Sequence, residues 1–487
     1  MAQNAVVAAA GRLTDWISIG VLASSVARDA VDEAVAACGK QAKRSDGKLP
    51  PHVMVYFAMA MALFADEDYE EVLARLAETL TGWGCWDTRW QMPGSGGITQ
   101  ARQRLGCEPL ERLFGEVARP VCEVLTRGAW LAGRRLVSID GLEWDAPDSK
   151  ANAAYFGYAG GTANPSAFPK VRVLTLVESG SHAVFGARIG PTSGKSSGEQ
   201  SMARALYPLL EPDMLLLADR NFYSFTDWCA AADTGADLLW RLGEGIDLPL
   251  VRMLGDGSYL SLVFPARIRR PERDRILAAA RAGRDIDEDK ARLVRVVEYQ
   301  IPDRGNDAER ELICLLTTIL DPTDAPAEIL AQGYHDRWGH ETGNDQLKTH
   351  LRGPGRVLRS HSPDMVRQEI HGYLLTHYAI SALITRAATE ADIDPDRVKF
   401  LHTVRIVRRR IDDPAAFPPD RLDALLAKIR REISTQRHLN PARPDRCYPR
   451  VVKRARHNSY RVKQPTDVGV RHPGPPTIDL VNLRLIA

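Results

Sequence analysis

Hydrophobic residues in the first 130 positions recur at the spacing of α-helices. Residues 53–65 form the longest uncharged apolar run, and three acids, Asp66, Glu67 and Asp68, close it. A membrane span needs about 20 apolar residues, so this run of 13 predicts a buried core helix instead. The next helix is indicated by one apolar face, made of Tyr69, Val72, Leu73, Leu76 and Leu80.

Two further helices are expected at residues 98–105 and 109–125, after a break rich in Gly and Pro at residues 93–97. Gly106 separates the two, and helices around such a turn are compatible with a DNA-binding helix-turn-helix. The same pattern is common in helical bundles, so both interpretations stay open.

Short apolar runs after Arg134 predict strands. The expected strands cover residues 136–140, 171–177, 183–189, 214–218 and 236–242, and the expected helices between them cover residues 199–210 and 224–232. The first and fourth strands end in an acid, Asp140 and Asp219 respectively. Open α/β sheets form their sites at strand ends, so an α/β fold with a site at these acids is indicated. The alternative for each Asp is an acid that only caps a turn or a helix.

Residues 244–320 interrupt this order with a β-rich segment. Its strands are expected at residues 259–264, 293–301 and 311–318, around a charged stretch at residues 267–290. Two long helices follow at residues 326–351 and 363–390, and the second is expected to be amphipathic. Shorter helices come after residue 395, and the end of the chain from Asn440 is rich in Pro and Arg.

The composition is that of a globular protein. The chain has 487 residues, of which 44% are hydrophobic and 26% are charged, and this excludes collagen-like and wholly disordered classes. Its seven cysteines contain no C-x-x-C pair, which indicates free thiols in a reducing compartment. No positive charge precedes the apolar residues 5–10, as a secretory signal would require. We therefore expect a cytoplasmic protein.

Charge is unevenly distributed along the chain. The net charge is only +2, but residues 401–487 contain 19 Lys or Arg against 8 Asp or Glu. An acidic body with a basic end predicts an anionic partner at that end. Arg405, Arg408, Arg409 and Arg410, with Lys453, Arg454 and Arg456, are its main basic groups. A solvated tail without a partner remains the alternative.

The first long helix carries an unusual polar stripe. At 100° per residue, Tyr334, Arg337, Glu341 and Lys348 fall within about 60° of its circumference. Such a stripe is either a solvated face with a weak i, i+4 ion pair or a surface directed at an anionic substrate. Three carboxylates from distant parts of a chain, here Asp140, Asp219 and Glu341, can bind two Mg²⁺ ions for an in-line displacement at phosphorus.

The helix matches the spacing Y-x2-R-x3-E-x6-K at every position. With Ser138-Ile139-Asp140-Gly141 and with residues 218–224, Ala-Asp-Arg-Asn-Phe-Tyr-Ser, it resembles the insertion-sequence-4 family of bacterial DDE transposases. The resemblance covers residues 135–385, and the first 130 residues resemble the family's N-terminal domain more weakly.

The resemblance implies an α/β fold with an RNase H-like catalytic domain at residues 134–390, interrupted by the insertion at residues 244–320. Residues 1–133 would form a helical N-terminal domain that contacts DNA ends. Residues 391–487 would form a helical, basic region for DNA contact or dimerisation. The implied activity is cleavage at terminal inverted repeats and strand transfer into target DNA. The implied assembly is a homodimer in the synaptic complex, and the implied location is the bacterial nucleoid.

The same resemblance assigns roles to individual residues. Asp140, Asp219 and Glu341 would bind two Mg²⁺ ions, which Mn²⁺ could replace. The expected DNA contacts are Tyr334, Arg337, Lys348, Trp338 and Arg220. Related enzymes hold a flipped base with a Trp in the insertion, but residues 244–320 contain none. Trp240 and Trp338 are the candidates in its place, and a hairpin intermediate remains open.

A segment that looks like a phosphate-binding loop is rejected. Gly190-Pro191-Thr192-Ser193-Gly194-Lys195-Ser196 lacks the first Gly of the nucleotide-binding pattern, since that position is Ile189. We predict no nucleotide cofactor and a flexible loop at residues 193–197. Two rival functions are a decayed copy that only binds DNA and an RNase H-fold nuclease without strand transfer. The unbroken motifs disfavour both.

Overall fold

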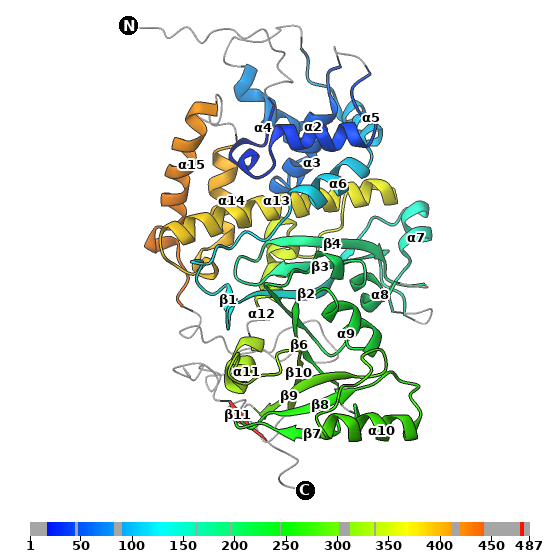
Figure 1. The fold of residues 1–487 in the computed structure, drawn as a ribbon. Helices are drawn as coiled ribbons and strands as arrows, with labels where there is room; N and C mark the ends of the chain where they lie inside the picture. Colours follow the sequence, from blue (N-terminus) through cyan, green and yellow to red (C-terminus); the bar gives the residue numbers. More distant parts are fainter. Residues whose placement is uncertain are drawn as a thin grey trace, which may run out of the picture.

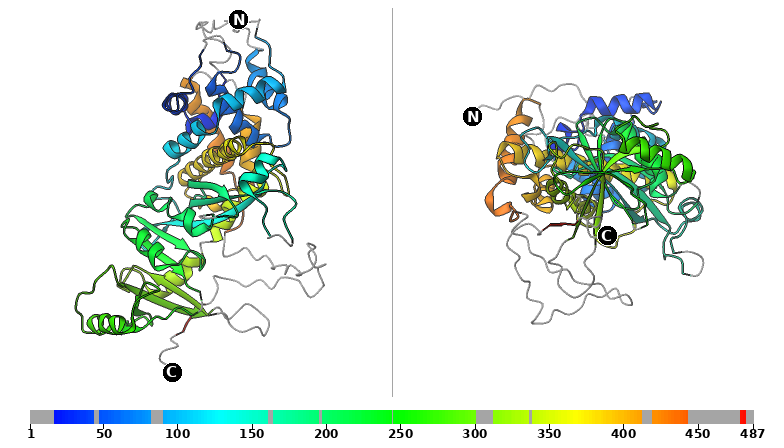
Figure 2. Two further views of the ribbon diagram at one scale, coloured as in Figure 1. Left: turned by 90° about the vertical axis from the view of Figure 1, so that its right-hand side faces the viewer. Right: turned by 60° about the horizontal axis from the view of Figure 1, so that its bottom comes forward.

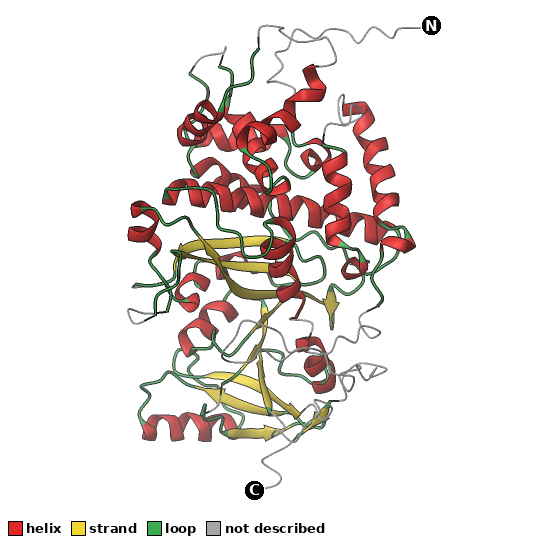
Figure 3. Ribbon diagram, turned by 180° about the vertical axis from the view of Figure 1, so that it is seen from behind, coloured by secondary structure: helices red, strands yellow, loops and turns green. Residues whose placement is uncertain are grey.

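The computed structural model describes residues 17–43, 47–81, 90–160, 164–194, 197–243, 245–300, 312–335, 338–411, 419–442 and 478–481. Helices gather at one end of the molecule, a twisted sheet forms the middle, and a smaller group of strands with one helix forms the other end (Figure 1). The same order is seen from the side (Figure 2) and from behind (Figure 3). In the parts of the chain named above, no helix is long and apolar enough to cross a membrane.

One 11-stranded sheet runs through the described residues, with the main order β4-β3-β2-β5-β6-β10-β9-β8-β7. The strands on this path are β2 (Arg134–Asp145), β3 (Lys170–Glu178), β4 (Val184–Pro191), β5 (Met214–Ala218), β6 (Asp237–Arg241), β7 (Leu250–Met253), β8 (Tyr259–Val263), β9 (Arg292–Gln300) and β10 (Ile313–Thr317). The short strands β1 (Trp130–Leu131) and β11 (Asp479–Leu480) pair with β2 and β9. The pairs β2–β5 and β5–β6 are parallel, and the remaining pairs are antiparallel.

The helical end begins with the N-terminal residues. Its elements are η1 (Gly20–Ser24), α2 (Arg28–Ala37), α3 (Pro51–Leu63), α4 (Tyr69–Thr81), α5 (Ser95–Leu105) and α6 (Glu108–Val117). Every residue of α3 from His52 to Leu63 is buried, which confirms the core helix expected there. The helix α6 stops well before residue 125, because Pro120 disfavours helical backbone at Arg119.

The long helix α13 (Pro363–Glu390) lies between the helical end and the sheet (Figure 1). We expected it to be amphipathic, and this was wrong. All of its residues from Gln368 to Thr385 are buried, because α3 and α6 cover one side and β4 approaches the other. Gly372 allows the close approach of α3, since a Cβ there would collide with the carbonyl oxygen of Ala58.

The first part of the basic C-terminal region is folded onto α13. The elements η4 (Pro395–Arg397), α14 (Phe400–Arg409) and α15 (Pro419–Ile433) contact it, and η6 (Gln436–His438) follows. Arg405 and Arg409 are exposed on α14, whereas Lys453, Arg454 and Arg456 lie outside the described residues.

The opposite end contains the strands expected at residues 244–320. They do not form a separate sheet, because β10 pairs with β6 and extends the central sheet outward. The helix α10 (Arg270–Arg281) accounts for the charged stretch, and it packs near β7. The helix α11 (Ala327–His335) then returns the chain toward the middle of the sheet.

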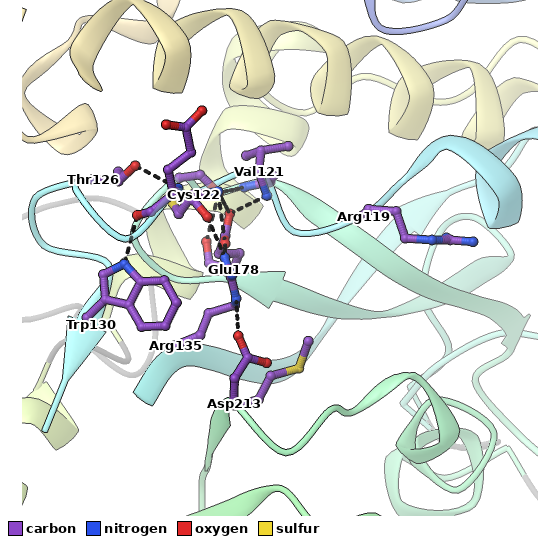
Figure 4. Close-up of polar contacts among 12 residues, drawn as sticks. Arg119, Val121, Cys122, Thr126, Trp130, Arg135, Glu178 and Asp213 are labelled. Carbon is purple, nitrogen blue, oxygen red and sulfur yellow. Dashed lines mark hydrogen bonds and ion pairs between the residues drawn. The ribbon is translucent and has the colours of Figure 1, made fainter. Parts of the chain in front are cut away.

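A buried carboxylate fastens the segment that joins the helical end to the sheet. Glu178, at the end of β3, is fully buried and accepts hydrogen bonds from the backbone N–H groups of Val121 and Cys122 (Figure 4). It also accepts from the Ser181 hydroxyl and pairs with Arg135. Four donors therefore compensate one buried charge, as buried ions require.

Candidate active site

Asp140 lies inside β2 rather than at its end. We expected the strand to stop there, but it continues to Asp145 because β3 pairs with it along its whole second half. The parallel pairing of β2 with β5 is different, since its last register pair is Ser138 with Leu217. Beyond Ser138, β5 no longer pairs with β2. Asp140 therefore lies beside an unpaired edge of β2, which is the kind of position expected for an acid at a strand end.

Asp219 follows β5 directly, as predicted, and starts a tight turn. Its Oδ1 accepts the N–H of Asn221 at 2.7 Å, and its carbonyl oxygen accepts the N–H of Phe222 at 3.1 Å. Asp219 therefore does cap a turn, as the alternative interpretation predicted. The turn also fixes the direction of the carboxylate, so the two interpretations are compatible.

The register of the parallel pair would bring the two Asp residues close together. If the register of β2 and β5 is continued by two residues, Asp140 comes beside Asp219, and neighbouring strands lie about 4.8 Å apart. A second observation agrees with this. The pKa of Glu199 is raised, first by burial, and then by the charges of Asp140 and Asp219 among others, whereas Arg172 opposes the rise.

Glu199 is a residue that sequence reasoning missed. It begins α8 (Glu199–Ala203), and its carboxylate rests against the Cα of Gly141, where a Cβ would collide with it. The side chain of Gln200 donates to the carbonyl oxygens of Asn221 and Tyr223, which ties α8 to the turn after Asp219. The sequence contains one indication of this contact, Gly141, because a glycine within a strand often marks a place where another group comes close to the backbone.

The third expected acid, Glu341, belongs to α12 (Trp338–Asp345). This helix contacts β2, the strand that carries Asp140. Gly343, two residues further, lies against His182 and Val177, so α12 crosses β2 and β3 near the acids. The side chains of Glu341 and Trp338, and the whole of Arg337, lie outside the described residues.

Tyr334 is buried, with 5% of its surface exposed. It packs in the cluster of apolar residues behind β5, and its hydroxyl donates to the carbonyl oxygen of Ala218 at 3.3 Å. This bond joins α11 to the residue immediately before Asp219. The expected contact of Tyr334 with DNA stays a prediction.

The expected uniform α-helix changes its winding before Lys348. Residues Gln346–Leu351 form a π-helix, η3, so the angle calculated at 100° per residue does not apply beyond Asp345. Lys348 is exposed there, and Arg220 is exposed in the turn after Asp219. Residues 195–196 of the expected flexible loop lie outside the described residues.

Trp240 is not available to a flipped base. It is fully buried in β6, where its ring lies 5.4 Å from that of Trp228 and 6.3 Å from that of Tyr207. Its candidacy was therefore wrong.

The donor set fits a divalent metal. Carboxylate oxygens are hard ligands that suit Mg²⁺ and similar ions, and adjacent like charges favour a bound cation. Asp140 and Asp219 would supply two such ligands. Among the side chains that the structure describes, no three His, Cys, Asp or Glu residues form a complete site. A third acid from α12 would complete the set.

Comparisons with known proteins show which family the chain is similar to. Residues 16–115 match the family described as insertion element 4 transposase N-terminal, and residues 131–378 match the transposase DDE domain. The transposase InsG for insertion sequence element IS4 of Escherichia coli (strain K12) is 27% identical over 412 residues, which cover 83% of this chain and 86% of InsG. The putative transposase InsZ of the same strain is 30% identical over 147 residues, 30% of this chain and 48% of InsZ.

Among solved structures, the cryo-EM structure of a piggyBac transposase synaptic complex with hairpin DNA aligns over 84% of both chains, with 9% identity and a TM-score of 0.40. That score is too low to establish a shared fold. The DDE domain match spans more than half of the chain. With the N-terminal match beside it, the chain belongs to the insertion-sequence-4 family of DDE transposases.

Proposed function

We propose that residues 134–390 form an RNase H-like catalytic domain in which Asp140, Asp219 and Glu341 bind the metal ions. The observation that supports this best is the parallel register of β2 and β5, which would place Asp140 beside Asp219 if continued by two residues. The strand order β4-β3-β2-β5-β6 also suits this fold, because three antiparallel strands are followed by two parallel ones.

DDE transposases use divalent metal ions, and we propose Mg²⁺ for this protein, with Mn²⁺ as a substitute. When bound, two such ions activate the attacking hydroxyl and stabilise the leaving oxygen. The protein's own contribution is to hold the acids in place. The turn at Asp219 and the bond from Tyr334 to Ala218 fix one acid, and the β2–β3 ladder fixes Asp140.

DNA phosphates near the scissile bond would be held by cations of the same helix and turn. Lys348 and Arg220 are exposed, as this role requires, and Arg337 and Trp338 are proposed to join them. The substrate is the pair of terminal inverted repeats of an insertion sequence, followed by target DNA. Residues 1–133 and 391–487 would contact the ends and support a homodimer on nucleoid DNA.

The test is strand cleavage by the full-length protein. A labelled duplex that carries the flanks of its own gene is incubated with Mg²⁺ or with EDTA, beside the Asp219→Asn variant. Nicking at a repeat boundary that requires Mg²⁺ and is absent in the variant would support the proposal.

Two other results would oppose it. Binding without nicking, under conditions where paired ends form, would indicate a decayed copy that only binds DNA. Nicking without joining to added target DNA would favour a nuclease of the same fold.

A further inference from the structure

A cavity of about 900 Å³ lies between the N-terminal helices and the segment that follows η3. Its walls come from the turn between α3 and α4, from α5, from residues 352–362 and from the first part of α13. We call it the Arg352 cavity. Residue 357 on its wall bridges to Asp145, and the N–H of Leu358 donates to the carbonyl oxygen of Asp145. The cavity is therefore attached to the far end of β2, the strand that carries Asp140.

The other arginines that line the cavity already have partners within the protein. Arg356 pairs with Asp66, and Arg359 donates to the carbonyl oxygens of Met61, Phe64 and Glu67. Arg102 donates to the side chains of Gln368, Tyr69 and Ser360.

The acids of the cavity are also compensated. Glu67 pairs with Arg75, and Asp66 with Arg356. Glu369 accepts from the Ser360 hydroxyl and the N–H of Arg359, and Asp68 accepts the N–H of Glu71. These acids therefore add little uncompensated negative charge to the cavity.

Arg352 is different. Only 3% of its surface is exposed, and its Nε and Nη1 are buried without a hydrogen-bond partner in the part of the chain that the structure describes. The guanidinium lies 5.4 Å from the ring centre of Trp144, which orients it but accepts no conventional hydrogen bond. Asp145 and Glu369 act on it only through their charge, since Asp145 pairs with Lys170 and Glu369 has the partners given above. Burial lowers the pKa of Arg352, and the charges of Tyr373, Asp145 and Glu369 only partly oppose this.

A buried guanidinium without an acceptor is costly, and such groups in native proteins normally have a partner. The planar guanidinium is well suited to a phosphate, which it can bind with two hydrogen bonds. The location favours DNA as the source of that phosphate. Asp145 lies five positions after Asp140 on β2, a distance of about 17 Å, and backbone phosphates follow one another about every 3.4 Å of helix axis.

We propose that the Arg352 cavity binds a backbone phosphate of the DNA, on the order of five nucleotides from the phosphate at the acids. The inference rests on the proposed function, because it takes DNA as the substrate. It goes beyond that function by assigning a separate phosphate site, next to α5 and α13 and away from the acids.

The first experiment tests whether Arg352 stabilises the fold or serves to bind a ligand. Arg352→Met in the full chain is compared with Arg295→Met as a matched control. Both arginines are buried, but Arg295 donates to Ser258, Asp256 and the carbonyl oxygen of Ala325. Without DNA, we expect Arg352→Met to melt at or above the wild-type temperature, whereas Arg295→Met melts lower. A loss as large as that of Arg295→Met would overturn the proposal.

The second experiment measures binding to a labelled duplex that carries the flanks of the gene, between about 50 and 200 mM salt. Arg352→Met should bind more weakly, and its plot of log K against log salt should be shallower by about 0.9, the value for one lost phosphate contact. Ethylation of single phosphates should interfere with wild-type binding at one position that has no effect in the variant. Unchanged affinity and slope would overturn the DNA assignment.

Two further outcomes distinguish a free phosphate from DNA as the ligand, and the Arg352 site from the proposed catalysis. If inorganic phosphate raises the wild-type melting temperature but DNA binding is unaffected in the variant, the ligand is a free phosphate and the DNA assignment fails. A chain that binds DNA with the expected difference but never nicks it would leave the Arg352 site standing and refute the proposed catalysis instead.

Discussion

Replacement of Gly141 by Ala should displace Glu199 from the acids. A Cβ at this position would lie 3.1 Å from Cδ and 3.4 Å from Cγ of Glu199, and closer still to its carboxylate oxygen. Carbon atoms prefer contacts of about 3.5–4.0 Å, so the carboxylate must move by on the order of 1 Å. The backbone of β2 cannot yield instead, because β3 pairs with it on both sides of Gly141.

The expected effect is on the rate and not on folding. Burial raises the pKa of Glu199, and the charges of Asp140 and Asp219 raise it further. A displacement of about 1 Å within an active site can slow a reaction on the order of 10²-fold. Glu199 is half-buried on a short helix, so its movement should leave the melting temperature and DNA affinity close to those of the wild type.

The assay is nicking of the flank duplex with Mg²⁺ under single-turnover conditions. Gly343→Ala is the matched control, because its Cβ would meet nothing nearer than 3.6 Å although it stands two residues from Glu341. In a Glu199→Ala background the added methyl group at residue 141 should have no further effect. Full-rate nicking by Gly141→Ala, or an equal slowing in that background, would refute the displacement.

Three other changes have clear expected outcomes. Glu341→Gln should abolish cleavage and leave DNA binding nearly intact, which a gel of nicking beside a binding titration checks. Glu178→Gln should destabilise the protein by about 3–5 kcal/mol in urea unfolding followed by tryptophan fluorescence, because Arg135 loses its buried partner. Replacement of Lys453, Arg454 and Arg456 in the C-terminal tail by Ala should weaken DNA binding and flatten its salt dependence, and it keeps β11, which pairs with β9. An unchanged slope would show that this tail does not contact phosphates.

Local patterns predicted much of the fold. The buried helix α3, the strands β3, β4 and β5 and both bounds of α13 follow from apolar runs and their breaks. Local patterns could not show what covers an element. The helix α13 carries polar residues such as Gln368 and His377 that suggest a solvated face, yet these are buried and hydrogen-bonded to other parts of the chain.

Long-range pairing is the second limit. The length of β2 depends on β3, and the extension of the sheet depends on β10 meeting β6, more than 70 residues apart in sequence. The local periodicity of apolar residues does not show which strands pair with one another. For the same reason the acids Asp140 and Asp219 were predictable as candidates, but the proposal that they lie side by side required the parallel register of β2 and β5.

Glu199 and Arg352 share the reason why sequence reasoning missed them. Each is a single charged residue outside any motif, and its role depends on the residues that surround it. Glu199 matters because a glycine lets it reach the acids, and Arg352 matters because every other charge in its cavity has a partner. The motif residues mark the proposed catalytic site. If the proposals hold, Glu199 adjusts that site and Arg352 holds the DNA that enters it.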